Sequence, residues 1–304
     1  MVEDLIDVSR DRAAQLADRV SRKSVAVRSS FVVSMDPATP PPMTLMMRGG
    51  RGGGVKLKLL LSMLWIAVKE PYDVTQSARV WAELIGLDEP ETRGAARVNA
   101  AVRRLVEGNF LEVEKRPGQS SRLILREETG RGVAYTHPGS HWEKHEGMAL
   151  PKNAPRYTQI PTGIWTEGWI ATLDAPAIAM LLILLEQTRG KNYDGLWFSP
   201  SVAAKRYGLS EATRRKGIDE LDKFGIIAVD RVAVGRGTLS EIRRRNTFSI
   251  DLTRLSQRPE DKAKRLFISQ PSSRPRKSDV RDTIAELNQA QKASADAKTE
   301  DAKV

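Results

Sequence analysis

The segment of residues 198–248 constrains the fold of this chain more than any other part of the sequence. A helix signal over residues 201–209 runs directly into a second helix signal over residues 210–227. Ser210 is a natural N-cap for the second helix, because its hydroxyl can accept a hydrogen bond from a free backbone N–H of the first turn. Two alternating strands follow, joined by a loop and closed by Arg243-Arg-Arg-Asn-Thr-Phe. The segment therefore predicts helix, turn, helix and hairpin in that order.

The second helix has one apolar and one charged face. Ile218 and Leu221 fall on the apolar face, whereas Arg215 and Lys216 look outward. A short helix, a glycine-containing turn and a second helix with cations at its start is how a protein presents side chains to the major groove of DNA. The order helix, turn, helix and basic hairpin resembles the winged helix-turn-helix family. That resemblance implies a small helical core with a hairpin wing, and sequence-specific binding of duplex DNA without a catalytic site.

Two apolar stretches, residues 59–68 and 175–185, each open a similar series of elements. Each stretch is most simply the buried first helix of a domain. After the first stretch the sequence predicts a helix that ends at Gly86, a longer helix over residues 90–107, and a basic-tipped hairpin with strands at 111–114 and 123–126. Residue identity between the copies is mostly limited to Gly-Leu in the turn and to the glycine that closes the longer helix, Gly108 or Gly225. The repeat therefore lies in the order of elements and in the placement of positive charge.

These patterns predict a mainly helical α+β chain with two winged helix-turn-helix domains and flexible extensions at both ends. An N-terminal helix with Ala13 and Leu16 on one face would pack on a partner subunit, as in a homodimer formed through this arm, or on the first domain. Residues 36–54, which contain Pro-Pro-Pro and two Arg-Gly-Gly triplets, are expected to form a linker. The expected division is residues 1–54 as arm and linker, 55–127 as the first winged domain, 128–156 as connection, 157–255 as the second winged domain and 256–304 as a disordered or marginally helical tail.

The composition supports a nucleic-acid partner. The chain of 304 residues has a formal net charge of +11 and no cysteine. The charge favours a polyanion, whereas the missing thiols exclude disulfide scaffolds and cysteine-ligated zinc. The apolar stretches are shorter than the roughly 20 residues that span a bilayer, and the acidic N-terminus lacks a signal core. We therefore expect no membrane contact and a cytoplasmic, nucleoid-associated protein.

Four residues at the start of the helix over 210–227 are the first candidates for DNA contact: Thr213, Arg214, Arg215 and Lys216. The guanidinium of Arg215 matches the two major-groove acceptors of guanine, so we expect it to read a base. Thr213 and Lys216 more naturally hold phosphate. The alternative is a solvated helix face on which acidic residues later in the helix pair with the cations.

The second hairpin supplies further candidates at its tip and on its return strand: Arg236, Arg243 and Arg245. Alternation along a strand sends Arg243 and Arg245 to one face and Arg244 to the other. A wing of this type crosses phosphates or enters the minor groove. The alternative is an edge strand whose charges protect it against aggregation.

In the first domain, the candidates on the helix over residues 90–107 are Arg93, Arg97, Asn99 and Arg104. Asparagine is a plausible reader of adenine. The alternative is a charged outer face or a domain interface. The basic tip of the first hairpin adds Lys115, Arg116 and Arg122.

The sequence offers no argument for catalysis, a cofactor or a metal. His137, His141 and His145 have helical spacing, but Pro138 and Gly139 interrupt any such helix. No Ser/His/Asp grouping, paired carboxylates or phosphate-cradling loop is present. We therefore expect a transcriptional regulator that binds double-stranded DNA. The alternatives are a plasmid or mobile-element replication initiator that binds repeated origin sites, and a winged-helix adaptor that binds protein.

Overall fold

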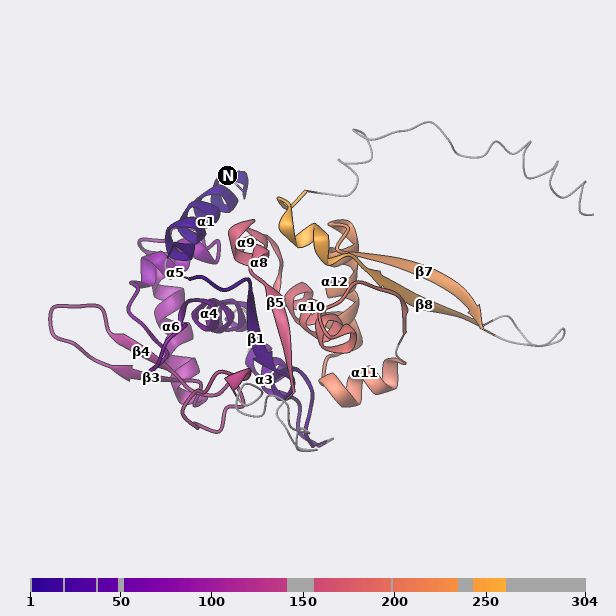
Figure 1. Cartoon of the computed structure of the whole chain (residues 1–304), viewed down its shortest axis with the longest axis horizontal. Coiled ribbons are helices and arrows are strands. Elements are labelled where there is room, and N and C mark those ends of the chain that lie inside the picture. Colours follow the sequence, from indigo (N-terminus) through magenta and orange to yellow (C-terminus); the bar gives the residue numbers. More distant parts are fainter. Residues whose placement is uncertain are drawn as a thin grey trace, which may run out of the picture. The chain divides into compact units, whose positions relative to one another are not determined.

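The computed structural model describes residues 2–18, 20–36, 38–48, 52–140, 156–197, 199–234 and 243–260. All of these residues belong to one compact unit, Met1–Lys262. Within the described ranges, helices combine with two three-stranded sheets and one two-stranded sheet, all antiparallel (Figure 1). The expected combination of helices with small sheets is confirmed.

Two apolar helices lie at the centre of the unit (Figure 1). α4 (Gly53–Ile66) and α10 (Ala175–Thr188) contain the two apolar stretches, and most of their residues are buried. A helix that is apolar on all sides needs protein on all sides, and α4 and α10 also contact each other. The indole of Trp65 in α4 stacks on that of Trp165, which precedes α10 in the sequence, with 5.2 Å between ring centroids. Side chains from both stretches therefore belong to one continuous core.

α4 is followed by five elements: β2 (Asp73–Val74), α5 (Ala78–Leu84), α6 (Arg93–Glu107), β3 (Leu111–Glu114) and β4 (Arg122–Leu125). β4 is the middle strand and pairs with both of the others. The two helices and the hairpin are confirmed, with boundaries that differ by a few residues from the expected ones. The short strand β2 has no counterpart in the sequence-based prediction.

α10 is followed by five elements in the same order: β6 (Tyr193–Leu196), α11 (Pro200–Tyr207), α12 (Glu211–Lys223), β7 (Ile227–Val234) and β8 (Arg243–Ile250). Here β8 is the middle strand, since β6 and β7 both pair with it. The order of elements and the order of strands are therefore the same in both series. We refer to residues 53–125 as the first repeat and to residues 175–250 as the second repeat. Their hairpins extend from opposite sides of the unit (Figure 1).

Both repeats turn between their second and third helices at a glycine. Gly86 has φ +69° and Gly208 has φ +65°, a conformation that glycine adopts without steric cost. The next residues, Leu87 and Leu209, are both buried. The Gly-Leu identity between the two copies therefore marks one shared turn.

The third helices also end alike, but not at the residues that the sequence comparison paired. The residue with positive φ is Asn109 after α6 and Gly225 after α12, so Gly225 corresponds to Asn109 and not to Gly108. Asparagine is the commonest substitute for glycine in this conformation. In both repeats the next backbone N–H donates to a leucine carbonyl five residues back, Phe110 to Leu105 and Ile226 to Leu221.

The N-terminal helix α1 (Val2–Ala17) packs on α5 of the first repeat. The hydroxyl of Ser9 donates to the Leu84 carbonyl, and Arg12 Nε donates to the buried Glu83 carboxylate at 2.8 Å. Ala13 and Leu16 on the apolar face of α1 are buried within the chain. Of the two expected locations for this face, the structure therefore shows the one on the first repeat.

The segment between α1 and α4 forms three short elements: β1 (Ser24–Arg28), α2 (Ser29–Val32) and α3 (Pro42–Met47). α3 differs from the expected linker, because Met43 and Met46 are buried. Proline in the first helical turn is well tolerated, so the proline-rich composition misled the prediction at this point.

β1 pairs with β5 (Tyr157–Pro161), so two strands on either side of the first repeat in the sequence form one small sheet. Two short helices, α8 (Gly163–Thr166) and α9 (Trp169–Thr172), lead from β5 to α10, and the 3-10 helix η1 (Leu252–Ser256) follows β8.

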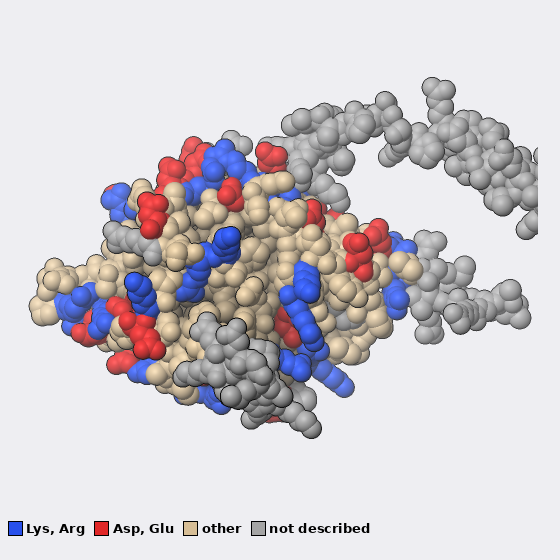
Figure 2. Space-filling view, viewed as in Figure 1, with Lys and Arg blue, Asp and Glu red and all other residues tan. Residues whose placement is uncertain are grey.

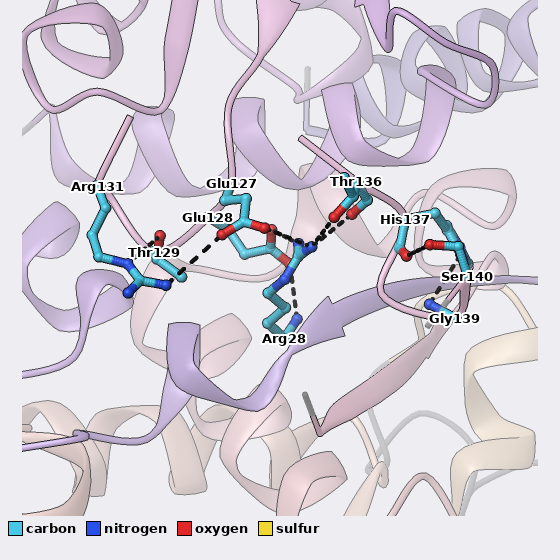
Figure 3. A network of polar contacts seen from close by, with 9 residues as sticks. All are labelled: Arg28, Glu127, Glu128, Thr129, Arg131, Thr136, His137, Gly139 and Ser140. Atoms are coloured by element: carbon cyan, nitrogen blue, oxygen red, sulfur yellow. Dashed lines mark hydrogen bonds and ion pairs between the residues drawn. The ribbon is translucent and has the colours of Figure 1, made fainter. Parts of the chain in front are cut away.

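A buried ion pair joins β1 to the segment that follows β4 (Figure 3). The backbone N–H of Arg28 donates to Glu128 Oε1 at 2.8 Å, and its Nη1 donates to Oε2 at 2.7 Å. Nη2 of Arg28 donates to the Thr136 carbonyl at 2.7 Å and lies 3.0 Å from Glu127 Oε1. Burial raises the pKa of Glu128, and the charge of Arg28 opposes that rise. Part of the expected inter-domain connection is therefore packed against β1.

Some predictions lie outside the described residues. They concern Arg236 at the second hairpin tip, His141 and His145, and the tail beyond residue 260. Among the helices that the structure does describe, none has the length and apolar character needed to cross a membrane.

Candidate nucleic-acid interface

The start of α12 is fixed by a helix cap and by close packing on α10. Ser210 accepts a hydrogen bond from the Thr213 backbone N–H at 3.2 Å, which confirms the predicted N-cap. Gly217 and Leu221 lie on the buried face of α12. A Cβ at Gly217 would lie 2.3 Å from the Pro176 carbonyl oxygen of α10. The opposite face of α12 is thereby directed away from α10.

That outer face carries the predicted contact residues of the second repeat. The Arg215 side chain is 83% exposed and lies 3.7 Å from Asp219 one turn later. Lys216 donates to Asp174 at the start of α10 at 2.6 Å, and this hydrogen bond raises the pKa of Lys216. Thr213 and Arg214 are half-buried. Arg215 is therefore the most exposed of the three cations, and its ion pair with Asp219 is longer than that of Lys216 with Asp174.

α6 presents a similar row of exposed side chains. Arg93 forms a bidentate pair with Glu89, and Arg104 donates to Glu107 at 2.8 Å. Arg97 and Asn99 are exposed and make no side-chain hydrogen bond or ion pair with any residue that the structure describes. These two residues are thus the least engaged candidates on α6.

The first hairpin does not hold all of its predicted cations at the tip. Lys115 is exposed in the loop, and Arg116 donates to the Ser120 carbonyl within it. Arg122 instead begins β4, where its Nε donates to Asp73 of β2 at 2.6 Å. Hydrogen bonds to Asp73 and Glu114 raise the pKa of Arg122. Arg122 therefore ties the sheet together.

In the second hairpin, Arg243 is paired in register with Val234, and Arg245 with Val232. The guanidinium of Arg245 lies over the indole of Trp197, 4.8 Å from the ring centroid. Trp197 follows the edge strand β6 and is itself 46% exposed. The side chain of Arg243 lies outside the described part of the chain. Arg245 thus has an aromatic neighbour that the sequence did not indicate.

A pocket of about 580 Å³ brings parts of both repeats together. It is lined by Arg97 of α6 and by Thr213 and Lys216 of α12. Three charged residues that sequence reasoning missed also line it: Arg48, Lys58 and Asp174. The sequence carried one signal for this site, since Lys56 and Lys58 are charged residues in an otherwise apolar helix.

Lys58 is the most perturbed cation in this pocket. Its Nζ donates to the Ala171 carbonyl at 3.1 Å. Burial lowers the pKa of Lys58 to about 8, and Arg97 acts in the same direction, whereas Asp174 and Glu220 oppose the change. Lys58 is therefore mainly charged at neutral pH while held in a partly buried position.

The charged side chains are not gathered into one basic patch on the face shown in Figure 2. Lysines and arginines lie beside aspartates and glutamates at several places, with uncharged surface between them. Ion pairs such as that of Arg93 with Glu89 likewise set a cation beside a carboxylate. The candidate interface is therefore defined by individual exposed residues of α6 and α12.

Comparison of the chain with models of known protein families, with curated proteins and with solved structures found no match.

Proposed function

We propose that this chain is a sequence-specific, double-stranded-DNA-binding protein with two winged helix-turn-helix domains, acting as a transcriptional regulator. The observation that carries the proposal is the repeated order of helix, strand, two helices and hairpin, with the return strand in the middle of both sheets. In both repeats the third helix carries exposed cations on the face away from the core. This combination is the arrangement that presents a helix to the major groove and a hairpin to the flanking backbone.

α12 and α6 are the proposed recognition helices. Arg215 has the exposure and the fork geometry for guanine, and Asn99 has the donor and acceptor pattern for adenine. Lys216 and Thr213 would hold phosphate, as would Lys115 at the first hairpin tip. Arg122 is not a proposed DNA contact, because its charge is already paired with Asp73.

The packing of α4 on α10 supports a target with two half-sites. The two repeats share one core, so their recognition helices have a fixed relation within the unit. A replication initiator that binds repeated origin sites would use the same chemistry. Footprinting of bound DNA across a genome separates the two roles, since a regulator protects promoters and an initiator protects an origin.

The test of duplex-DNA binding is the dependence of affinity on salt. If helices and hairpins together meet about 6–8 phosphates, log K should fall against log salt with a slope of about −5 to −7. Arg215→Ala should cost about 1–3 kcal/mol and relax preference at one base pair, whereas Lys216→Ala should weaken all sequences alike. Arg131→Ala is the matched control, because Arg131 is 72% exposed but lies outside both helices and both hairpins.

A salt slope near zero would reject the proposal. Equal effects of Arg215→Ala on every sequence would show that Arg215 does not read a base. Binding of an acidic protein with an affinity equal to that for DNA would favour the adaptor function instead.

A further inference from the structure

The pocket of about 580 Å³ lies where four helices and the segment before α4 converge. α4 and α10 contribute their first turns through Gly54 and Ala175, and α12 contributes its cap Ser210. α6 adds Arg97, and the end of α3 adds Met47. The volume is within the range of small-molecule sites, about 300–1,000 Å³.

Positive charge dominates the lining. Four cations, Arg48, Lys58, Arg97 and Lys216, face one carboxylate, Asp174. Asp174 is engaged with Lys216 at 2.6 Å. Among the described residues, Arg48 and Arg97 have no acidic partner. The pocket therefore holds more cationic charge than its own residues neutralise.

At Lys58 this unbalanced positive charge raises the free energy of the folded state. Its Nζ has three N–H donors, and the one hydrogen bond described for it goes to the Ala171 carbonyl. A partly buried ammonium with unfilled donors raises the free energy of the folded state. An anion in the pocket would accept those donors and offset the charge.

The backbone favours the same kind of ligand. The N-cap of α4 is Gly52, which has no side chain to accept from the first backbone N–H groups of that helix. Free backbone N–H groups and the positive end of the helix dipole attract anions at such positions. Gly54 also leaves room, because it places no side chain in the pocket that it lines.

We propose that this pocket binds a small phosphate-bearing molecule, with Lys58 and Arg97 as its principal charged contacts. Phosphate fits because it offers several strong acceptor oxygens and up to two negative charges. Arg97 supplies a guanidinium fork, and Lys58 supplies a point charge.

Such a ligand would regulate DNA binding, an effect that rests on the proposed function. Arg97 of α6 and Lys216 of α12 belong both to the pocket and to the candidate recognition helices. A bound phosphate withdraws these cations from DNA, so the ligand and DNA weaken each other by the same factor.

The experiment is calorimetric titration of sodium pyrophosphate into the full chain at pH 7, without DNA or divalent cations. Wild type should bind saturably, and both Lys58→Met and Arg97→Ala should weaken binding at least about tenfold, the loss of roughly one charged hydrogen bond. Arg93→Ala is the matched control, because Arg93 lies one turn earlier on α6, outside the pocket and paired with Glu89. It should change affinity less than about twofold. Sodium sulfate at equal ionic strength measures screening.

Absence of saturable pyrophosphate binding overturns the inference, as does an equal loss in Arg93→Ala and Arg97→Ala. Pyrophosphate binding by a chain that fails the DNA salt test would retain the pocket and reject the DNA function. DNA binding by a chain that does not bind pyrophosphate would reject the ligand of the pocket and retain the DNA function. Arg97 is exposed, so its substitution leaves the fold intact and keeps the test decisive if Lys58→Met folds poorly.

Discussion

Arg28 is the residue on which the attachment of β1 to the segment after β4 depends. Its partner Glu128 is fully buried, and two of its hydrogen bonds reach that carboxylate. Arg28→Met should lower the free energy of unfolding by about 3–5 kcal/mol, because the buried Glu128 carboxylate keeps the backbone N–H of residue 28 but loses its cationic partner. Urea denaturation, read from the midpoint at constant slope, measures the change.

Arg131 provides the control for this prediction. It approaches Glu127 at 3.9 Å from an exposed position, so Arg131→Ala should cost less than about 1 kcal/mol. Equal stability of wild type and Arg28→Met would show that Glu128 is held in its neutral form.

Lys58 should make stability depend on pH in the alkaline range. In the folded chain the pKa of Lys58 is about 8, below the ordinary 10.5. Below pH 8 Lys58 is therefore protonated in both the folded and the unfolded state, and the folded state carries the full free-energy cost of burying the charge. As pH rises from 8 to 10.5, the folded chain loses its proton first and the free energy of unfolding rises. Lys58→Met should stabilise the chain at pH 7 by about 2 kcal/mol, the pKa shift less one lost hydrogen bond, and should abolish the rise.

Denaturation at pH 7 and pH 10 distinguishes the outcomes. A Lys58→Met variant that is less stable than wild type at pH 7 would mean that the carboxylates of Asp174 and Glu220 more than compensate the buried ammonium. Both carboxylates act on the pKa of Lys58 in that direction, and Arg97 opposes them.

At the scale of elements, the packing of α12 on α10 depends on the absence of a side chain at Gly217. A Cβ at Gly217 would lie 2.3 Å from the Pro176 carbonyl and 2.6 Å from Met180 Cγ. Gly217→Ala should therefore displace α12 and destabilise the fold by about 1–3 kcal/mol, although alanine is the better helix former. In the control Gly52→Ala the new Cβ meets nothing within 4 Å, and stability should stay within about 0.5 kcal/mol of wild type.

If Gly217→Ala proves neutral in denaturation and in α-helical circular dichroism, the contact between α10 and α12 is looser than the structure shows. The DNA affinity of the same variant then reports whether the position of α12 matters for binding.

Elements with a strong local signal were predictable from the sequence. The apolar runs gave α4 and α10, and the cap at Ser210 gave the start of α12. β2 and β6 escaped because they are short edge strands: β2 has two residues, and β6 contains Asp194 and Gly195, which break any alternating pattern. Such edge strands are stabilised by pairing with the middle strand of their sheet, and the sequence of the edge strand alone does not show that pairing.

The candidate site was predictable only in part, for the same reason. Arg97 and Lys216 stand out as cations on helix faces, but the sequence does not show that they line one pocket with Lys58. Arg122 looked like a hairpin-tip cation because its partner Asp73 is 49 residues away in sequence. Pairings of this kind are set by packing between distant elements.

At the scale of the whole molecule, the shared core predicts how the chain would tolerate changes in its DNA site. Two domains on a flexible tether would regain affinity when a full helical turn of DNA is inserted between the half-sites. Repeats fixed by the packing of α4 on α10 should not. Insertions of about 5 and about 10 base pairs should both cost about 100-fold or more in affinity, measured by fluorescence anisotropy on a site taken from footprinting.

Recovery of most of the affinity at the full-turn insertion would contradict the fixed arrangement. It would mean that the two repeats separate on DNA, and that the packing of α4 on α10 opens in the complex.

The pairing of β1 with β5 also sets an order of events on the ribosome. β1 is complete at Arg28, whereas its partner strand ends at Pro161, after the whole first repeat has been made. Translation at about 5–20 residues per second separates these two points by roughly 7–27 s. During that interval Val25 and Val27, which are buried in the finished protein, belong to an unpaired strand edge that invites wrong partners. β5, which is synthesised late, thus protects β1, which is synthesised early. Chaperones that bind β1 during this interval would therefore raise the yield of folded protein.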